Sequence, residues 1–207
     1  MRIALLGGTG RIGRELLGLL PAAGYDVAVL ARRPQSVPAA TGLTVVEGDA
    51  LDAAAVAAVI EGSDAVMSAL GPRGAKSPSL LAEAAANTVA AMKEADVRRL
   101  IAVSAAGAFI EADPDSSALV RLVLPRIFAR QFADTRRMEE VIRASDLDWT
   151  LVRPTRLVNR PATERYRTRS DFPPQRGMTI SRADVARFMV DALDQHSWIG
   201  AAPVLAY

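Results

Sequence analysis

Short apolar runs alternate with longer segments of helical periodicity through the first half of the chain. The apolar runs are typical of buried strands, and the segments between them repeat apolar residues at helical spacing. The predicted strands are 3–6, 27–30, 43–46, 65–70 and 100–103, and the predicted helices between them are 11–20, 51–60 and 78–95. Parallel neighbours need crossover connections, so this alternation predicts an α/β fold with a doubly wound parallel sheet and helices on both faces.

The second half of the chain is less regular. Its pattern predicts helices at 118–130, 134–144 and 182–193 and a strand at 149–152, with Ser181 as the N-cap of the last helix. Prolines and a glycine interrupt residues 155–178, which we expect to form a small substrate-facing lobe of one single domain, 1–207. The apolar stretch 118–128 suits either core or interface.

Composition agrees with one globular domain and excludes several kinds of chemistry. The chain has 207 residues, of which 50% are hydrophobic, and no cysteine, so disulfides, thiolate metal sites and a cysteine nucleophile are excluded. A net charge of +2 does not indicate nucleic-acid binding. The sequence lacks a long apolar run or a signal-like start, so we expect no membrane partner and a cytoplasmic location. We expect a monomer or weak homo-oligomer.

A glycine-rich loop follows the first predicted strand directly. It reads Gly7-Gly8-Thr9-Gly10-Arg11-Ile12-Gly13 and opens the first predicted helix. Its spacing differs by one residue from the dinucleotide fingerprint, but the physical roles carry over: a tight turn at Gly7, room for a pyrophosphate at Gly10, and close helix packing at Gly13. Phosphate then lies at the positive helix N-terminus. The loop predicts dinucleotide binding, and a plain tight turn is the alternative.

Two arginines stand where a dinucleotide site distinguishes its cofactors. An acid that binds the ribose 2′-hydroxyl of NAD is expected at the end of the second strand, but this chain has Arg32 and Arg33 there. Guanidinium groups suit a 2′-phosphate, with which they form charge-assisted hydrogen bonds. We therefore predict NADP(H) as the cofactor, unless one of the pair is only a solvated residue.

The ends of the third and fourth strands complete the predicted groove. Asp49 and Ala50 follow the third strand, where the carboxylate of Asp49 is placed to reach the adenine amino group or, alternatively, to cap the next helix. Ala69, Leu70 and Gly71 follow the fourth strand, and small residues there let the chain pass close to a ribose. Packing alone is the alternative explanation.

The segment between residues 156 and 176 is strongly basic. It contains six arginines and only two acids. Such a run forms either solvated loop and strand faces or a wall that faces an anionic ligand.

Several motifs together resemble the atypical short-chain dehydrogenase/reductases. They are the glycine loop, Gly48-Asp49, Val103-Ser104-Ala105, the run from Trp149 to Pro154, and the run from Ser181 to Ala186. Within that family the chain is most similar to the NAD(P)H-binding group, which includes NmrA-like proteins and the biliverdin reductase B or flavin reductase type. The resemblance implies a Rossmann-like fold, Pro154 at the cofactor, and Ser104 as the active-site serine. A serine that merely ends a strand is the alternative.

The chain departs from the wider family at its proton donor. Typical members carry a Tyr-x-x-x-Lys pair on the helix after the fifth strand, and the best-placed match here is Phe132 with Arg136. Phenylalanine has no proton to give. We therefore expect an NADPH-dependent reductase that transfers hydride to a planar, conjugated, anionic acceptor such as a flavin, a quinone or a biliverdin-like compound. The alternative is a non-catalytic NmrA-like protein that senses NADP, and a sugar-nucleotide epimerase is a third, weaker interpretation.

Overall fold

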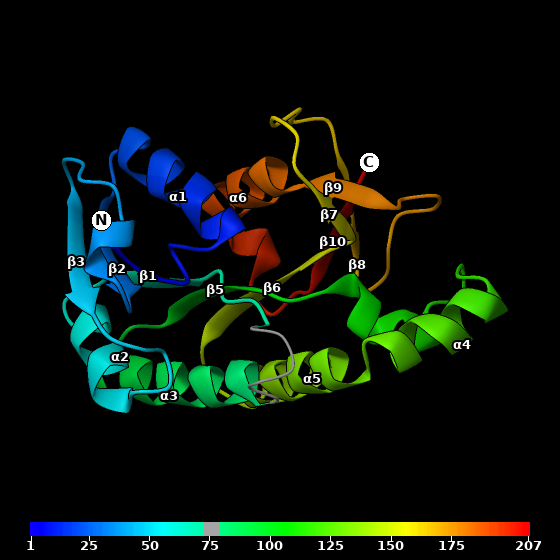
Figure 1. The fold of residues 1–207 in the computed structure, drawn as a ribbon, viewed down its shortest axis with the longest axis horizontal. Coiled ribbons are helices and arrows are strands. Elements are labelled where there is room, and N and C mark those ends of the chain that lie inside the picture. Colours follow the sequence, from blue (N-terminus) through cyan, green and yellow to red (C-terminus); the bar gives the residue numbers. More distant parts are fainter. Residues whose placement is uncertain (73–78) are drawn as a thin grey trace.

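A predominantly parallel sheet forms the centre of the molecule. The computed structural model describes residues 1–72 and 79–207 (Figure 1). Within these residues eight strands form one sheet in the order β3-β2-β1-β4-β5-β6-β10-β8. Their bounds are β1 Arg2–Leu6, β2 Asp26–Ala31, β3 Leu43–Glu47, β4 Ala65–Ser68, β5 Arg99–Val103, β6 Asp148–Pro154, β8 Arg167–Ser170 and β10 Pro203–Ala206. Of the neighbouring pairs, only β10 with β8 is antiparallel. The predicted parallel α/β sheet is confirmed.

Helices cover both faces of this sheet, as Figure 1 shows. On one face lie α1 (Arg11–Ala22) and α6 (Arg182–Asp191), which pack against each other. On the other face lie α2 (Ala53–Ile60), α3 (Leu80–Glu94) and α5 (Ala129–Arg143). Each face has its own apolar core, one built around Leu16, Leu20 and Met189 and the other around Val59, Met92 and Ile142. Among the described residues, no helix has both the length and the apolar character needed to span a membrane.

The two helices predicted at 118–130 and 134–144 meet at a different boundary. Helix α4 (Ala118–Ile127) has Phe128 as its C-cap. Helix α5 starts at the next residue, Ala129, which is five residues before the predicted start. No residue of α4 is buried, and Leu119 and Ile127 are 69% and 64% exposed. The apolar stretch is therefore not core. It projects from one end of the molecule after the short 3₁₀ helix η3 (Ala106–Ala112).

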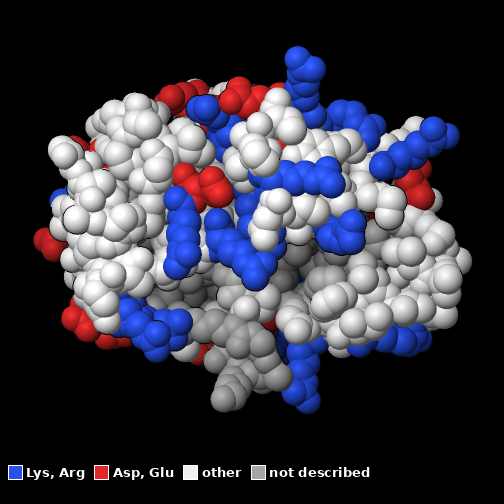
Figure 2. Space-filling view, turned by 45° about the horizontal axis from the view of Figure 1, so that its top comes forward, with Lys and Arg blue, Asp and Glu red and all other residues white. Residues whose placement is uncertain are grey.

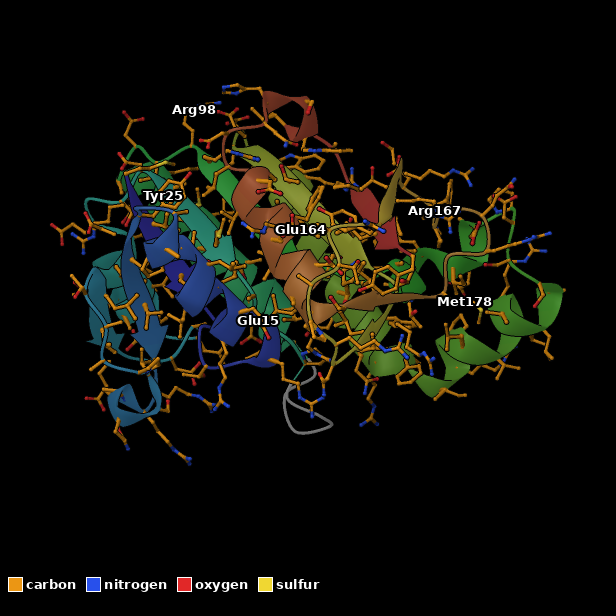
Figure 3. All side chains as sticks on the ribbon, turned by 90° about the horizontal axis from the view of Figure 1, so that it is seen from above. Glu15, Tyr25, Arg98, Glu164, Arg167 and Met178 are labelled. Atoms are coloured by element: carbon orange, nitrogen blue, oxygen red, sulfur yellow. The ribbon has the colours of Figure 1, made fainter. Side chains whose placement is uncertain are left out.

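Short strands that the sequence pattern did not predict lie in the segment 155–178 and just beyond it. Strand β8 adds to the edge of the main sheet, and all of its residues are exposed. Strands β7 (Arg156–Val158) and β9 (Thr179–Ser181) pair in a separate sheet of two strands. The segment thus divides between the main sheet and a small second one. Figure 3 shows Arg167 and Met178 on this side of the molecule, toward α4.

The start of α6 depends on a buried carboxylate. Ser181 caps the helix as predicted, since its Oγ accepts the N–H of Asp184 at 2.9 Å. Asp184 is itself fully buried and accepts hydrogen bonds from the Tyr207 hydroxyl at 2.5 Å and from the backbone N–H of Glu164 at 2.8 Å. Burial raises the pKa of Asp184, but its hydrogen bonds with Tyr207, Glu164, Ser181 and Thr163 outweigh burial and lower the pKa below its ordinary value.

Replacing Asp184 with asparagine should make stability less dependent on pH. Because the folded-state pKa is lowered, the ionised carboxylate stabilises the protein above the unfolded-state pKa, and this contribution is lost as pH falls through the folded-state pKa. We expect Asp184→Asn to cost at least about 2 kcal/mol at neutral pH, the scale of a charge-assisted hydrogen bond. The deficit should shrink below pH about 4, as measured by urea unfolding. Asp146→Asn, at a 91% exposed side chain, is the control and should leave the pH dependence unchanged; an Asp184→Asn deficit that stays constant with pH would contradict the prediction.

Candidate cofactor-binding site

The predicted site residues come together at one edge of the sheet. Strands β1 to β6 are parallel, so the residues that follow them meet at their common carboxyl edge. Gly7 follows β1, Arg32 follows β2, Asp49 follows β3, Ala69 follows β4 and Ser104 follows β5. The strand order reverses between β1 and β4, which is where an open α/β sheet forms its ligand crevice.

The glycine loop fits tightly between β4 and α1. Gly7 has a φ of +80°, and a Cβ atom there would lie 2.7 Å from the carbonyl carbon of Ala69. A Cβ on Gly13 would lie only 2.1 Å from the carbonyl oxygen of Gly7. Gly10 donates its N–H to that same oxygen at 2.9 Å and closes the turn. These glycines let α1 begin directly against the end of the sheet, as the motif predicts.

The N-terminus of α1 suits an anion. Gly10 is the N-cap, no side chain forms a capping hydrogen bond, and the first turn contains no acid. Among the described residues a Cβ on Gly10 would meet the Gly7 oxygen at 3.1 Å and otherwise only the Ala69 oxygen at 3.8 Å, so these residues leave this side of the loop open. Thr9 and Arg11 are exposed, whereas Ile12 is buried in the core and offers the ligand its backbone alone. Uncapped N–H groups with the helix dipole behind them fit a pyrophosphate.

Charges gather around this helix start. Arg182, the first residue of α6, donates to the Asn159 Oδ1 at 2.7 Å. Burial lowers the pKa of Arg182, and the positive charge of Arg11 lowers it further. Figure 2 shows basic side chains around a hollow on this side of the molecule. The sequence motif did not single out Arg182, because it is far from the glycine loop in the chain.

The ends of β2 and β3 also meet. The Arg32 Nε lies 3.8 Å from the Asp49 Oδ2, and both side chains remain partly exposed. Arg33 is exposed and precedes the short 3₁₀ helix η1 (Pro34–Ser36). The alternative that Asp49 caps the next helix is wrong, because Asp52 caps α2 by accepting the N–H groups of Ala54 and Ala55.

The remaining groove residues differ in how far they reach the surface. Ala50 is buried, and its carbonyl oxygen accepts a hydrogen bond from Asn87 at 3.1 Å. Leu70 packs against the core on the α2 and α3 side, whereas Gly71 is exposed. Pro154 is buried at the end of β6, opposite Leu205 of β10.

Ser104 belongs to a buried polar network that the sequence did not reveal. Its Oγ donates to the Glu139 Oε1 at 2.5 Å, and Ser104 and Glu139 are 8% and 1% exposed. Arg153 donates to both oxygens of Glu139, from Nε at 2.8 Å and from Nη2 at 2.6 Å. The Arg153 guanidinium also stacks on the Phe109 ring, 3.6 Å from its centroid. The arginine within the apolar strand β6 was the one local signal, whereas Glu139 does not stand out in α5, which is rich in charged residues.

The position of the missing proton donor is occupied by an aromatic ring. The Phe132 ring lies so close to Gly107 that a Cβ there would be 2.7 Å from its Cζ, so Phe132 flanks the loop that follows Ser104. Arg136 donates to the carbonyl oxygen of Ala108 at 2.8 Å. Tyr166 packs edge-on against Phe188 of α6, and burial, with nearby Asp191, Asp184 and Glu164, raises its pKa to about 12. Phe132 has no proton to donate, and the raised pKa makes Tyr166 a weak acid.

A family comparison identifies the class of ligand that binds at the carboxyl edge of the sheet. The model of a family described as NAD(P)H-binding matches residues 7–196. The chain belongs to this NAD(P)H-binding family. Its cofactor is therefore a nicotinamide dinucleotide, and the open start of α1 fits the pyrophosphate of that cofactor. Among the described residues, no cluster of side chains suits a metal ion.

Known proteins with similar sequences carry different names. The chain is 28% identical over 203 residues to an "Uncharacterized sugar epimerase YhfK" of Bacillus subtilis, covering 94% of this chain and 89% of that protein. It is 34% identical over 153 residues to a "(4-alkanoyl-5-oxo-2,5-dihydrofuran-3-yl)methyl phosphate reductase" of Streptomyces griseus, covering 73% of this chain and 46% of that protein. A short-chain dehydrogenase/reductase structure from Veillonella parvula in complex with NADP shares the fold, with a TM-score of 0.83 and 22% identity over 100% of this chain and 94% of that one.

Replacing Gly10 with valine should weaken cofactor binding while the protein still folds. Gly10 has a φ of −71°, which a side chain tolerates, and the Cβ would occupy the open side of the loop where a phosphate is expected. We expect at least a roughly tenfold loss of NADPH affinity by calorimetric titration, about one phosphate hydrogen bond. Gly18→Val is the control on the same helix and should bind normally, because a Cβ there meets no atom of the described residues within 4 Å apart from its chain neighbours and its own helix backbone. Full affinity in a folded Gly10→Val protein would show that phosphate binds elsewhere.

Proposed function

We propose that the protein is an NADPH-dependent reductase that transfers hydride to a planar, conjugated, anionic acceptor such as a flavin, a quinone or a biliverdin-like compound. The supporting observation is Phe132, which takes the place of the family's tyrosine beside the loop after Ser104. Reduction of a simple ketone needs a proton donor at that place, whereas a conjugated acceptor takes hydride into its π system and its proton from water. We include in this proposal that the protein belongs with the flavin reductase type that its sequence motifs resemble.

The side chains of the protein bind and orient the cofactor and the acceptor, while the nicotinamide, when bound, supplies the hydride. The start of α1 holds the pyrophosphate, and Arg32 and Arg33 bind the 2′-phosphate. The backbone at Ala69 and Leu70 lies next to Gly7 and would let the chain pass close to a ribose of the cofactor. A pair of guanidinium groups in reach of the 2′-phosphate favours NADPH over NADH.

The Streptomyces griseus relative supports the acceptor class. Its name describes the reduction of a dihydrofuran that carries an oxo group, an alkanoyl group and a phosphate. Such a ring combines conjugated carbonyl groups with an anionic substituent, the two properties proposed here. The six arginines between residues 156 and 176 are all exposed, which suits an anionic ligand. Two of them, on strand β8, also bond within the protein. Arg167 donates to the carbonyl oxygen of Tyr207, and Arg169 donates to the carboxylate of Asp115.

Reversing the charge of Arg32 should shift the cofactor preference. Arg32→Glu removes a charge-assisted contact worth about 1.5–3 kcal/mol, so NADPH affinity should fall by roughly one to two orders of magnitude while NADH affinity is kept. The measurement is the dissociation constant of both cofactors by titration. Lys93→Glu, near the end of α3, makes the same charge change and should leave the ratio unaltered. An unchanged ratio in Arg32→Glu would contradict the NADPH assignment.

Turnover with conjugated acceptors tests the reaction itself. We expect NADPH oxidation with FMN, a quinone or biliverdin, with FMN preferred over riboflavin at low salt and less so at high salt, because screening weakens the attraction between charges. Tyr166→Phe should stay within several-fold of the wild type, since Tyr166 packs on α6 and holds its proton tightly. NADPH binding without any turnover would favour the NmrA-like sensor instead. A loss of more than about a thousandfold in Tyr166→Phe, or about 4 kcal/mol, would make this tyrosine the proton donor.

A further inference from the structure

The hydrogen-bond pattern around Ser104 determines what its hydroxyl can offer a ligand. A serine hydroxyl has one proton to donate and two lone pairs to accept with. The proton of Ser104 points to the Glu139 Oε1, at an oxygen-to-oxygen distance of 2.5 Å. Only lone pairs therefore remain for a group that approaches Ser104 from the cofactor site.

Two arginines donate hydrogen bonds to the carboxylate of Glu139. Arg153 forms a bidentate ion pair with the Glu139 carboxylate, and the Arg153 side chain is only 5% exposed. Arg143, one turn along α5, adds contacts to the Glu139 Oε2 at 3.3 and 3.4 Å. A guanidinium group can only donate, so both oxygens of Glu139 act as acceptors in these contacts.

Arg153 is itself fixed from three directions, so the network has little freedom to reorient. Besides Glu139, its Nη1 donates to the carbonyl oxygen of Asp171 at 3.2 Å, and its guanidinium lies over the Phe109 ring. The network thus joins β5, α5, β6, the residue after β8, and η3. A buried, paired and stacked arginine holds Glu139 in one place, and Glu139 in turn holds the Ser104 hydroxyl.

We propose that Glu139 is a positioning residue that commits the only proton of Ser104, so that Ser104 presents a hydrogen-bond acceptor to the N–H of the nicotinamide carboxamide. Ser104 follows β5, on the side of the strand-order reversal that holds the nicotinamide half of a dinucleotide. The carboxamide is the N–H donor of that ring. Ser104 accordingly does not polarise an acceptor carbonyl. This inference rests on the part of the proposed function that places a nicotinamide at Ser104, and it is independent of the acceptor.

An analogue that lacks only the amide nitrogen tests the inference without turnover. In 3-acetylpyridine adenine dinucleotide phosphate a methyl group replaces the carboxamide NH₂. By calorimetric titration the wild type should bind NADP⁺ about three- to tenfold more tightly than this analogue, the effect of one hydrogen bond. Ser104→Ala should bind both with nearly equal affinity. A folded Ser104→Ala protein that keeps the full preference would overturn the proposal.

Glu139→Gln should also remove the preference, although Ser104 is still present. Oε2 of Glu139 accepts three guanidinium N–H contacts, whereas Oε1 accepts one. Because an amide NH₂ cannot accept these bonds, the amide oxygen of glutamine should occupy the position of Oε2. Its NH₂ then faces Ser104 and donates to it, which frees the Ser104 proton for the carbonyl that both ligands share. A purely structural role for Glu139 would lower stability and leave the preference between the two ligands intact.

Controls separate this inference from folding and from the reaction. Thr135→Val removes a different buried hydroxyl, which lies on α5 and, among the described residues, bonds to the carbonyl of Gln131, and this variant should keep the wild-type preference. If Glu139→Gln does not fold by circular dichroism, Glu139→Asp keeps the charge and withdraws it from Ser104, and the same loss of preference is expected. If neither variant folds, the Ser104→Ala result decides. Equal wild-type affinities would refute the inference, whereas preference without reductase turnover would refute the proposed reaction alone.

Discussion

The close approach of the glycine loop to the ends of β1 and β4 is the contact on which the rest of the site depends. Any side chain at Gly13 would collide with the Gly7 carbonyl, and any side chain at Gly7 would collide with the backbone of Ala69. Because these positions have no Cβ, α1 can begin directly over the crevice where the strand order reverses. Among the described residues no side chain caps the first N–H groups of α1, and such groups at a helix N-terminus suit an anion.

Local sequence signals were sufficient for the parts of the molecule that are built from neighbouring residues. The apolar runs of β1, β2, β4, β5 and β6 bury residues on both faces of the sheet, which makes them visible without knowledge of their partners. The glycine spacing and the Ser181 cap are also local, and the structure bears out both. Helix boundaries moved by a few residues because caps such as Asp52 and turns such as Phe128 decide where a helix starts.

The parts that escaped prediction depend on contacts between distant segments. Strand β8 is short, polar and fully exposed, and only its pairing with β10 makes it a strand. Ser104 was a candidate on its position alone, but the partners that decide its chemistry, Glu139 and Arg153, come from another helix and another strand. A single sequence shows the residue types of such a network and not their proximity. The exposure of α4 was equally invisible, since an apolar helical pattern looks the same whether or not another element covers it.

The place of the last strand has a consequence for how the chain folds during synthesis. Among the described residues β10 comes after the other strands of the sheet in sequence, yet it lies between β6 and β8, so β8 has its partner there only once β10 has been synthesised. The hydroxyl of the last residue, Tyr207, also completes the hydrogen bonds of Asp184 at the start of α6. A nascent chain can therefore assemble the half that contains the glycine loop early, because domains fold as the N-terminal part appears. The edge formed by β8 can close only after β10 (Pro203–Ala206) has left the ribosome.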